Sequence, residues 1–215
     1  MSAQGQAESK TYHHGDLRNA LILAAVELIE ESGSVDFAMI EAARRAGVSS
    51  AAPYRHFRDK DDLLLAVAEL CFLGLTQTSR DAMAAEDFGT EAAIVAIGRN
   101  YIRFSLQHRN FHDLMWGELG KRAMDADPEN LRGSGFYVLS DCVAALCERQ
   151  SIAPVDPVEL ATELWAMVHG LSCLAMNDQI DRFMPAADAF QLLESSTHTF
   201  FKGLRQQYAP APGSD

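Results

Sequence analysis

Residues 41–60, EAARRAGVSSAAPYRHFRDK, constrain the fold more than any other segment of this chain. The pattern predicts two short helices, at 37–46 and at 49–57, with a tight turn between them. Gly47 is well placed for that turn because glycine adopts positive φ without a steric penalty, and Ser49 can cap the second helix. The segment therefore predicts a compact pair of helices joined by a turn.

Cationic side chains are concentrated in the same segment. Between residues 44 and 60 the chain holds five Lys and Arg and one acidic residue, Asp59. The whole chain has a formal net charge of -12, and from Leu63 onward it holds 11 Lys and Arg against 20 Asp and Glu. A local basic face can still neutralise the phosphates of a nucleic acid, whereas the acidic remainder would repel them. We therefore expect DNA to dock at this end, with the rest of the chain held away from it.

The second predicted helix has the side chains expected of a helix that enters a major groove. Its first turn is small and carries two hydroxyls, and the free amides at its N-terminus suit a phosphate. Tyr54 and His56 add longer hydrogen-bonding groups, and Lys60 can reach a backbone phosphate. Arg44 and Arg45 fit a DNA contact and a merely solvated face equally well. The residues predicted to bind DNA are Arg44, Ser49, Ser50, Ala51, Tyr54, Arg55, His56 and Lys60.

Apolar residues are expected to hold these two helices together. Phe57 is predicted to lie in the core. Tyr54 is predicted to have a double role, with its ring packed against the neighbouring helix and its hydroxyl on a phosphate. The residues predicted to form this contact are Ala43, Ala46, Val48, Tyr54 and Phe57.

Residues 12–69 resemble the DNA-binding domain of TetR-family transcriptional regulators. The resemblance is carried by YHHGDLRNALILAAVELIEESG, an amphipathic first helix, and by EAARRAGVSSAAPYRHFRDKDDLLLAVAE, with its AGVS turn and its aromatic–x–His–Phe ending. It implies a homodimer whose two recognition helices enter successive major grooves of an operator. By position, it also implies phosphate contacts for Tyr54 and Lys60 and a place at the DNA surface for Ser49, Ser50, Ala51 and His56.

The chain departs from the family at the start of the second helix of this domain. Family members usually have Thr or Ser there and often a polar or basic residue two places later, where this chain has Ala38 and Ile40. We therefore expect the cap to shift to Asp36 or Ser34, and one backbone contact with DNA to be missing.

Beyond residue 85 the apolar residues keep helical spacing, and no alternating β-branched run occurs. We therefore predict an all-α fold, and the resemblance implies an N-terminal three-helix helix-turn-helix domain and a C-terminal helical bundle for ligand binding and dimerisation. The predicted division is a disordered arm at 1–12, the DNA-binding domain at 13–72, the ligand-binding and dimerisation domain at 73–208, and a disordered tail at 209–215.

The segment LWAMVHGLSCL, residues 164–174, resembles the Trp–x–x–x–His–Gly (WHG) signature of one C-terminal domain found in TetR-family proteins. Trp165 and His169 are four residues apart and share a helix face, and Gly170 would let another helix approach closely. The resemblance implies that this helix and the last one form a dimer interface as a four-helix bundle. The apolar stripes at 160–174 and 190–204 are expected to supply that interface.

The same resemblance implies a small-molecule pocket in the C-terminal domain, although aromatic residues at helical spacing are also ordinary core. His108 and His112 have the spacing of metal ligands, but the sequence offers no obvious third ligand. We therefore predict no metal, and no cofactor other than an unidentified small-molecule effector. The candidate pocket residues are Tyr101, Phe104, Phe111, Met115, Trp116, Trp165 and His169.

Together these patterns predict a cytoplasmic, sequence-specific DNA-binding transcriptional regulator, a repressor released from its operator by the effector. The four cysteines form no CxxC pair, which fits reduced thiols, and no apolar run reaches the roughly 18 residues of a membrane span. One alternative is a helical enzyme in which the helix-turn-helix is only structural, but no GxSxG, phosphate-loop or HExxH pattern occurs. Another is a constitutive architectural DNA binder, but such proteins are usually basic throughout.

Overall fold

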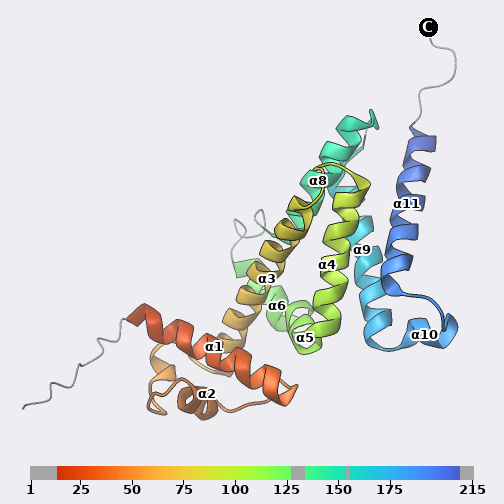
Figure 1. The fold of residues 1–215 in the computed structure, drawn as a ribbon. Helices are drawn as coiled ribbons and strands as arrows, with labels where there is room; N and C mark the ends of the chain where they lie inside the picture. Colours follow the sequence, from red (N-terminus) through yellow and green to blue (C-terminus); the bar gives the residue numbers. More distant parts are fainter. Residues whose placement is uncertain (1–13, 127–133, 154, 209–215) are drawn as a thin grey trace, which may run out of the picture. The chain divides into compact units, whose positions relative to one another are not determined.

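The computed structural model describes residues 14–126, 134–153 and 155–208, and every regular element in these ranges is helical (Figure 1). The prediction of an all-α fold is therefore confirmed. The predicted arm at 1–12 and the predicted tail at 209–215 lie outside the described residues.

The chain divides into two compact units, the first ending at Val67 and the second beginning at Ala68. The predicted boundary followed residue 72. Helix α3 (Lys60–Ala84) contains the division, so the first unit includes only its first turns. By length and composition α3 is the one helix in the described ranges that could cross a membrane, and ordinary core helices meet the same two criteria.

The first unit consists of α1 (His14–Ser32), α2 (Met39–Arg45), the 3₁₀ helix η1 (Pro53–Arg55) and the start of α3. Gly33 ends α1 with a φ of 66°, and its N–H donates to the carbonyl of Ile29 over 3.0 Å. Every element of the unit contributes to its core through buried side chains, among them Leu21, Ala25, Ile29, Ala42, Pro53, Phe57, Leu63 and Val67.

Residues 49–57 are called the recognition segment below. The prediction of a regular helix there is wrong. Only η1 is helical within it, and the residues before η1 form a turn in which the N–H of Ala52 donates to the carbonyl of Ser49 over 3.0 Å. Pro53 is the physical reason, because a residue without an N–H cannot donate to the Ser49 carbonyl in the α-helical pattern. The N–H of Phe57 donates to the carbonyl of Pro53 over 3.0 Å, so the segment is still closed by backbone hydrogen bonds.

The start of α2 also differs from the prediction, which placed a cap at Asp36 or Ser34. The N-cap residue is Ala38, whose side chain cannot accept a hydrogen bond. Instead the carboxylate of Glu41 reaches back and accepts from the N–H of Ala38 over 2.7 Å. This is half of a capping box, and it satisfies one backbone donor at a helix start that lacks the usual Ser or Thr.

The second unit is a bundle in which α4 (Glu91–Gln107) and α9 (Pro157–Met176) contact each other, and both contact α8 (Gly135–Arg149) and α11 (Ala189–Gln207) (Figure 1). The described part of the unit also contains α3 from Ala68 onward and the shorter helices α5 (Arg109–Trp116), α6 (Glu118–Ala126) and α10 (Gln179–Phe183). Three long helices begin with side-chain caps, which satisfy backbone N–H groups that have no partner within the helix. The capping residues are Thr90, Asp156 and Asp188.

Part of the two apolar stripes predicted to supply a dimer interface packs inside this unit instead, whereas the use of α9 and α11 in a dimer stays a prediction. Leu160 and Leu164 of α9, and Leu193 and Phe201 of α11, are all buried within the single chain. The reason is that α9 and α11 lie against α4, and the most apolar face of each helix is turned to that contact. Leu174, at the end of the first stripe, is 48% exposed and is an exception.

Candidate functional site

The recognition segment presents small and polar side chains to solvent. Ser49, Ser50 and Ala51 are exposed in the turn that precedes η1, and Arg55 is exposed within η1. His56 is half-buried at its end. The residues expected at a DNA surface are thus gathered on one short, hydrogen-bonded stretch of backbone.

Tyr54 does not have the packed ring that the sequence predicts, because it is 61% exposed. Pro53, which was not among the predicted packing residues, is fully buried beside it. The other predicted contacts behave as expected, since Ala43 and Phe57 are buried and Ala46 and Val48 are half-buried. The tight 3₁₀ turn is the cause: it points Pro53 inward and leaves the neighbouring tyrosine outside.

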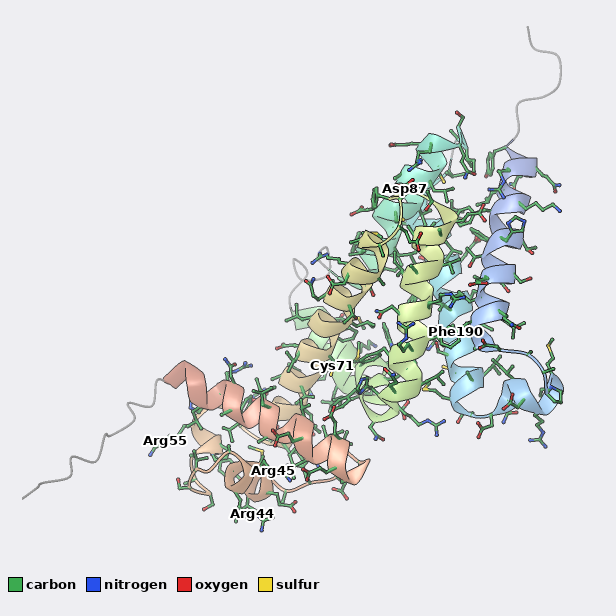
Figure 2. The ribbon with its side chains drawn as sticks, viewed as in Figure 1. Arg44, Arg45, Arg55, Cys71, Asp87 and Phe190 are labelled. Atoms are coloured by element: carbon green, nitrogen blue, oxygen red, sulfur yellow. The ribbon has the colours of Figure 1, made fainter. Side chains whose placement is uncertain are left out.

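The two adjacent arginines of α2 have different surroundings (Figure 2). Arg45 forms ion pairs with Glu27 and Glu31 of α1, and the hydrogen bond to Glu31 raises the pKa of the guanidinium and lowers that of the carboxyl. Arg44 is exposed and makes no ion pair with any described residue. The structure therefore separates the two: Arg45 links α2 to α1, and Arg44 remains available to an external anion.

Lys60 lies at the first position of α3 and is held by two neighbours. Its Nζ is 3.3 Å from Oδ1 of Asp36 and 5.3 Å from the centre of the Phe37 ring. The Asp36 side chain is 94% exposed, so the pair is screened by solvent and is worth roughly 0–1 kcal/mol. A phosphate can therefore compete with Asp36 for this ammonium at little cost.

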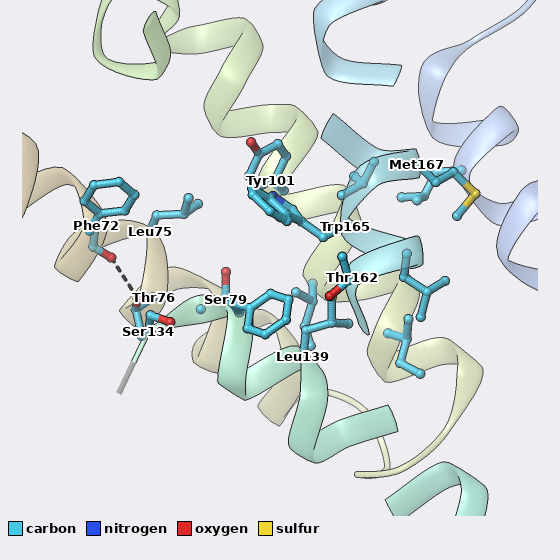
Figure 3. A pocket seen from close by; sticks show the side chains of 18 of the residues that line it. Phe72, Leu75, Thr76, Ser79, Tyr101, Ser134, Leu139, Thr162, Trp165 and Met167 are labelled. Atoms are coloured by element: carbon cyan, nitrogen blue, oxygen red, sulfur yellow. Dashed lines mark hydrogen bonds between the residues drawn. The ribbon is translucent and has the colours of Figure 1, made fainter. Parts of the chain in front are cut away.

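The second unit contains a cavity of about 310 Å³ between its helices (Figure 3). Its walls come from α3, α4, α8, α9 and α11, with single residues from α5 and α6. The lining is mostly apolar and includes no Lys, Arg, Asp or Glu among the described residues. A volume of this size fits a small organic molecule, since ligand pockets span roughly 300–1,000 Å³.

Of the seven residues predicted to line a pocket, Tyr101, Trp116 and Trp165 do so. The other four, Phe104, Phe111, Met115 and His169, are not among its lining residues. One wall of the cavity was not predicted from the sequence. It consists of Phe72, which was assigned to the DNA-binding domain, and of three residues of α3 that are not aromatic: Leu75, Thr76 and Ser79.

Two polar groups at this cavity have no hydrogen-bond partner in the described part of the chain. They are the indole Nε1 of Trp116 and the hydroxyl of Thr197, and both are buried. A buried polar group without a partner costs about 1–3 kcal/mol. Both side chains line the cavity, so a bound molecule that shifts them could satisfy both groups.

Next to the cavity, His169 of α9 is surrounded by polar and aromatic groups. Its Nδ1 is 2.7 Å from the hydroxyl of Tyr101, and its Nε2 is 3.6 Å from Sγ of Cys173. The ring of His112 lies 5.2 Å away, centre to centre, at an angle of 20°. Burial lowers the pKa of both histidines and raises that of Tyr101 and of Cys173. Burial therefore favours the neutral form of both imidazoles.

Comparison with known families and structures accounts for both units. Residues 21–67 match the profile of bacterial regulatory proteins of the tetR family, and residues 94–199 match that of the tetracyclin repressor-like, C-terminal domain. No match was found among curated proteins. The chain belongs to the TetR family, and it is a DNA-binding transcriptional regulator. The finer assignment of its C-terminal domain to the WHG type stays a prediction.

Solved structures share the fold. A protein of unknown function from Rhodococcus sp. RHA1 has 29% identity and a TM-score of 0.71, over 91% of this chain and 98% of that one. A fatty acid degradation regulator from Bacillus halodurans has 17% identity and a TM-score of 0.65, over 90% and 99%. The regulator RolR, in complex with resorcinol, has 18% identity and a TM-score of 0.61, over 94% and 97%.

Proposed function

We propose that the protein is a cytoplasmic repressor that binds its operator as a homodimer and leaves it when a small molecule occupies the cavity of the second unit. The observation that carries the proposal is the cavity itself, an apolar space with two buried hydrogen-bonding groups that have no partner in the described chain. A DNA-binding regulator needs no such space to hold its operator. A ligand that binds it can change operator affinity only by favouring one conformation over another.

The proposed DNA interface is the recognition segment together with Arg44 and Lys60. The exposed small residues Ser49 to Ala51 would approach base edges, and Tyr54 and Lys60 would contact phosphates. In a homodimer, two such segments spaced by roughly 34–36 Å would enter successive major grooves.

The proposed dimer interface uses the faces of α9 and α11 that are not packed against α4. On these helices Gly170 and Gly203 have open space where a Cβ would stand, so no part of the described chain covers them. Leu174 is exposed near the end of α9. A second copy that packed on these positions could approach closely, as helices do at small residues.

The lining of the cavity indicates the chemical class of the effector. The absence of cationic lining residues in the described ranges disfavours a carboxylate or phosphate ligand. The apolar and aromatic walls favour a small, neutral, largely apolar molecule, and the groups of Trp116 and Thr197 favour one that carries a hydrogen-bond acceptor. Resorcinol, the ligand bound to RolR, has this chemistry and is a suitable first compound to test.

The test combines operator binding with a variant that fills the cavity. Gly135 lines the cavity, and a Cβ built there comes no closer than 3.7 Å to Thr76, so the side chain of a Gly135→Leu variant starts in ordinary contact with the cavity wall. Gly74→Leu is the matched control, because its Cβ has open space outside the cavity.

Fluorescence anisotropy with the DNA upstream of the protein's own gene would be measured against a panel of small neutral aromatic compounds, beginning with resorcinol. An effector should release the wild type and the Gly74→Leu variant from DNA, and should release Gly135→Leu at least tenfold less effectively. Compounds that bind the cavity and leave operator affinity unchanged would refute the coupling. Turnover of a compound by a protein that binds no DNA would support the enzyme alternative instead.

A further inference from the structure

His112 is the most unusual buried side chain of the second unit. It is 3% exposed, and neither of its ring nitrogens makes a hydrogen bond within the described part of the chain. Oδ1 of Asp113 lies 3.5 Å from Nδ1, too long or poorly aligned for a hydrogen bond. Buried imidazoles are normally satisfied at one nitrogen at least, so this ring calls for a partner other than the described residues.

The groups nearest to His112 are metal ligands. Nitrogen atoms of His112 and His169 and the sulfur of Cys173 all lie within 4.8 Å of one another. They come from two helices, α5 and α9, that are separate in sequence. We propose that His112, His169 and Cys173 form a binding site for a borderline-soft divalent cation of the Zn²⁺ class, with a fourth position left open.

The separations agree with tetrahedral coordination before any ion is present. With Zn–S of about 2.3 Å and Zn–N of about 2.0 Å, a tetrahedral angle places sulfur and nitrogen about 3.5 Å apart. The observed distance from Cys173 Sγ to His169 Nε2 is 3.6 Å. The same geometry places two ligating imidazoles about 5 Å apart, centre to centre, and the rings of His112 and His169 are 5.2 Å apart. The ligand nitrogen of His112 lies within 4.8 Å of the other two ligand atoms, so its ring must move inward to complete the site.

The surroundings of the His169 ring assign one of its nitrogens to the metal. A ligating histidine usually holds its other nitrogen on an oxygen, which fixes the tautomer. The Tyr101 hydroxyl is 2.7 Å from Nδ1 of His169, and Nε2 of the same ring faces Sγ of Cys173. Nε2 is then the metal-binding atom of His169, whereas both nitrogens of His112 are without a hydrogen bond in the described part of the chain. Tyr101 acts here as a positioning residue, accepting the Nδ1 proton of His169.

Binding requires the thiolate form of Cys173. Its thiol therefore loses one proton to solvent as the sulfur–metal bond forms, while both imidazoles bind in their neutral form. Cys173 is half-buried rather than enclosed, which leaves a path for the ion and the proton. The site is separate from the proposed effector cavity, since none of the three ligands is among the residues that line it.

The chain provides matched controls for each ligand. Cys71 is a half-buried cysteine outside the cluster, so Cys71→Ser controls for Cys173→Ser. His108 is half-buried one turn before His112 and packs against Phe104 and Phe111 instead. His108→Gln therefore controls for His112→Gln, and it also tests the pair that sequence spacing alone suggested.

The experiment is a titration of the full-length, chelator-treated protein with Co²⁺, followed by displacement with Zn²⁺. The wild type should bind one Co²⁺ per chain, with a thiolate-to-cobalt charge-transfer band in the near ultraviolet, and Zn²⁺ should abolish the spectrum. Cys173→Ser should lose the band, and His112→Gln and His169→Gln should weaken binding more than about 100-fold. Tyr101→Phe should weaken it by 10–100-fold, the usual effect of removing an outer-shell partner.

Both control variants should bind like the wild type. Circular dichroism and thermal unfolding would be recorded for each variant. If His112→Gln fails to fold, the half-buried Cys173→Ser and the Tyr101→Phe variant still decide the result. No saturable Co²⁺ binding by the wild type, or binding that is unchanged in Cys173→Ser, would overturn the proposal. Because no DNA is present, failure of this test is independent of the repressor proposal.

Discussion

The pairing of Lys60 with Asp36 allows a quantitative test of the DNA interface. Lys60 is proposed to contact a phosphate, yet in the free protein its ammonium lies 3.3 Å from the Asp36 carboxylate. The Asp36 carboxylate and a DNA phosphate compete for the Lys60 ammonium. Removing Lys60 and removing the Asp36 charge should therefore have opposite effects on operator binding. Lys60→Ala should weaken binding, and Asp36→Asn should strengthen it.

The magnitudes follow from the exposure of the pair. Each phosphate contact contributes about 0.9 to the slope of log K against log salt concentration, so Lys60→Ala should reduce that slope by about 1.8 for a dimer. An exposed ion pair is worth roughly 0–1 kcal/mol, so Asp36→Asn should raise affinity by up to about fivefold per protomer. It should leave the slope nearly unchanged, because the number of phosphates contacted stays the same.

The assay is a salt titration of operator binding by fluorescence anisotropy, with Lys121→Ala as control. Lys121 is an exposed cation of the second unit, on α6, and its loss should leave the slope unchanged. A slope for Lys60→Ala equal to that of the wild type would refute the phosphate contact. A loss of affinity in Asp36→Asn would instead indicate that the ion pair positions Lys60 for DNA.

Two further predictions concern stability. Gly89 has a φ of 74° and a Cβ there would lie 2.8 Å from the Cβ of Ala145, so Gly89→Ala should destabilise the second unit by about 2–5 kcal/mol in urea unfolding. Gly74→Ala, in an open helical position of the same unit, should stabilise it by about 0.5–1 kcal/mol, and equal effects of the two changes would contradict the argument. Phe57→Ala, at 3% exposure, should cost about 3–5 kcal/mol. Tyr54→Ala, at 61% exposure, should change stability by less than about 0.5 kcal/mol while weakening operator binding.

The all-α fold class was predictable from the sequence because helical spacing is a local pattern. Gly33 and Gly47 have the positive φ values that their places after α1 and α2 require. The spacing of Leu160 and Leu164 marked α9 as a helix. The spacing of apolar residues does not show which neighbour a helix faces. Residues such as Leu160 and Leu164, predicted to face a second copy of the chain, are therefore found in the core of the second unit.

The recognition segment was predicted only in part from its local sequence. Its position and its exposed small residues were predicted, but its 3₁₀ form and the exposed ring of Tyr54 were not. Pro53 contributes to both, because it has no N–H to donate to the carbonyl of Ser49. Whether that turn continues as an α-helix depends on packing as well, and the burial of Pro53 belongs to the tertiary structure.

The sequence by itself determined that this chain is helical, that its cations gather near residues 44–60, and that it resembles one family of regulators. These properties depend on composition and on short-range spacing. Only the tertiary structure decided which groups meet across the second unit. Trp116 and Thr197 line the same cavity, and His112 lies near His169 and Cys173 rather than forming a site with His108. Helix packing brings together residues that are distant in the sequence, and the periodicity of a single helix does not predict those contacts.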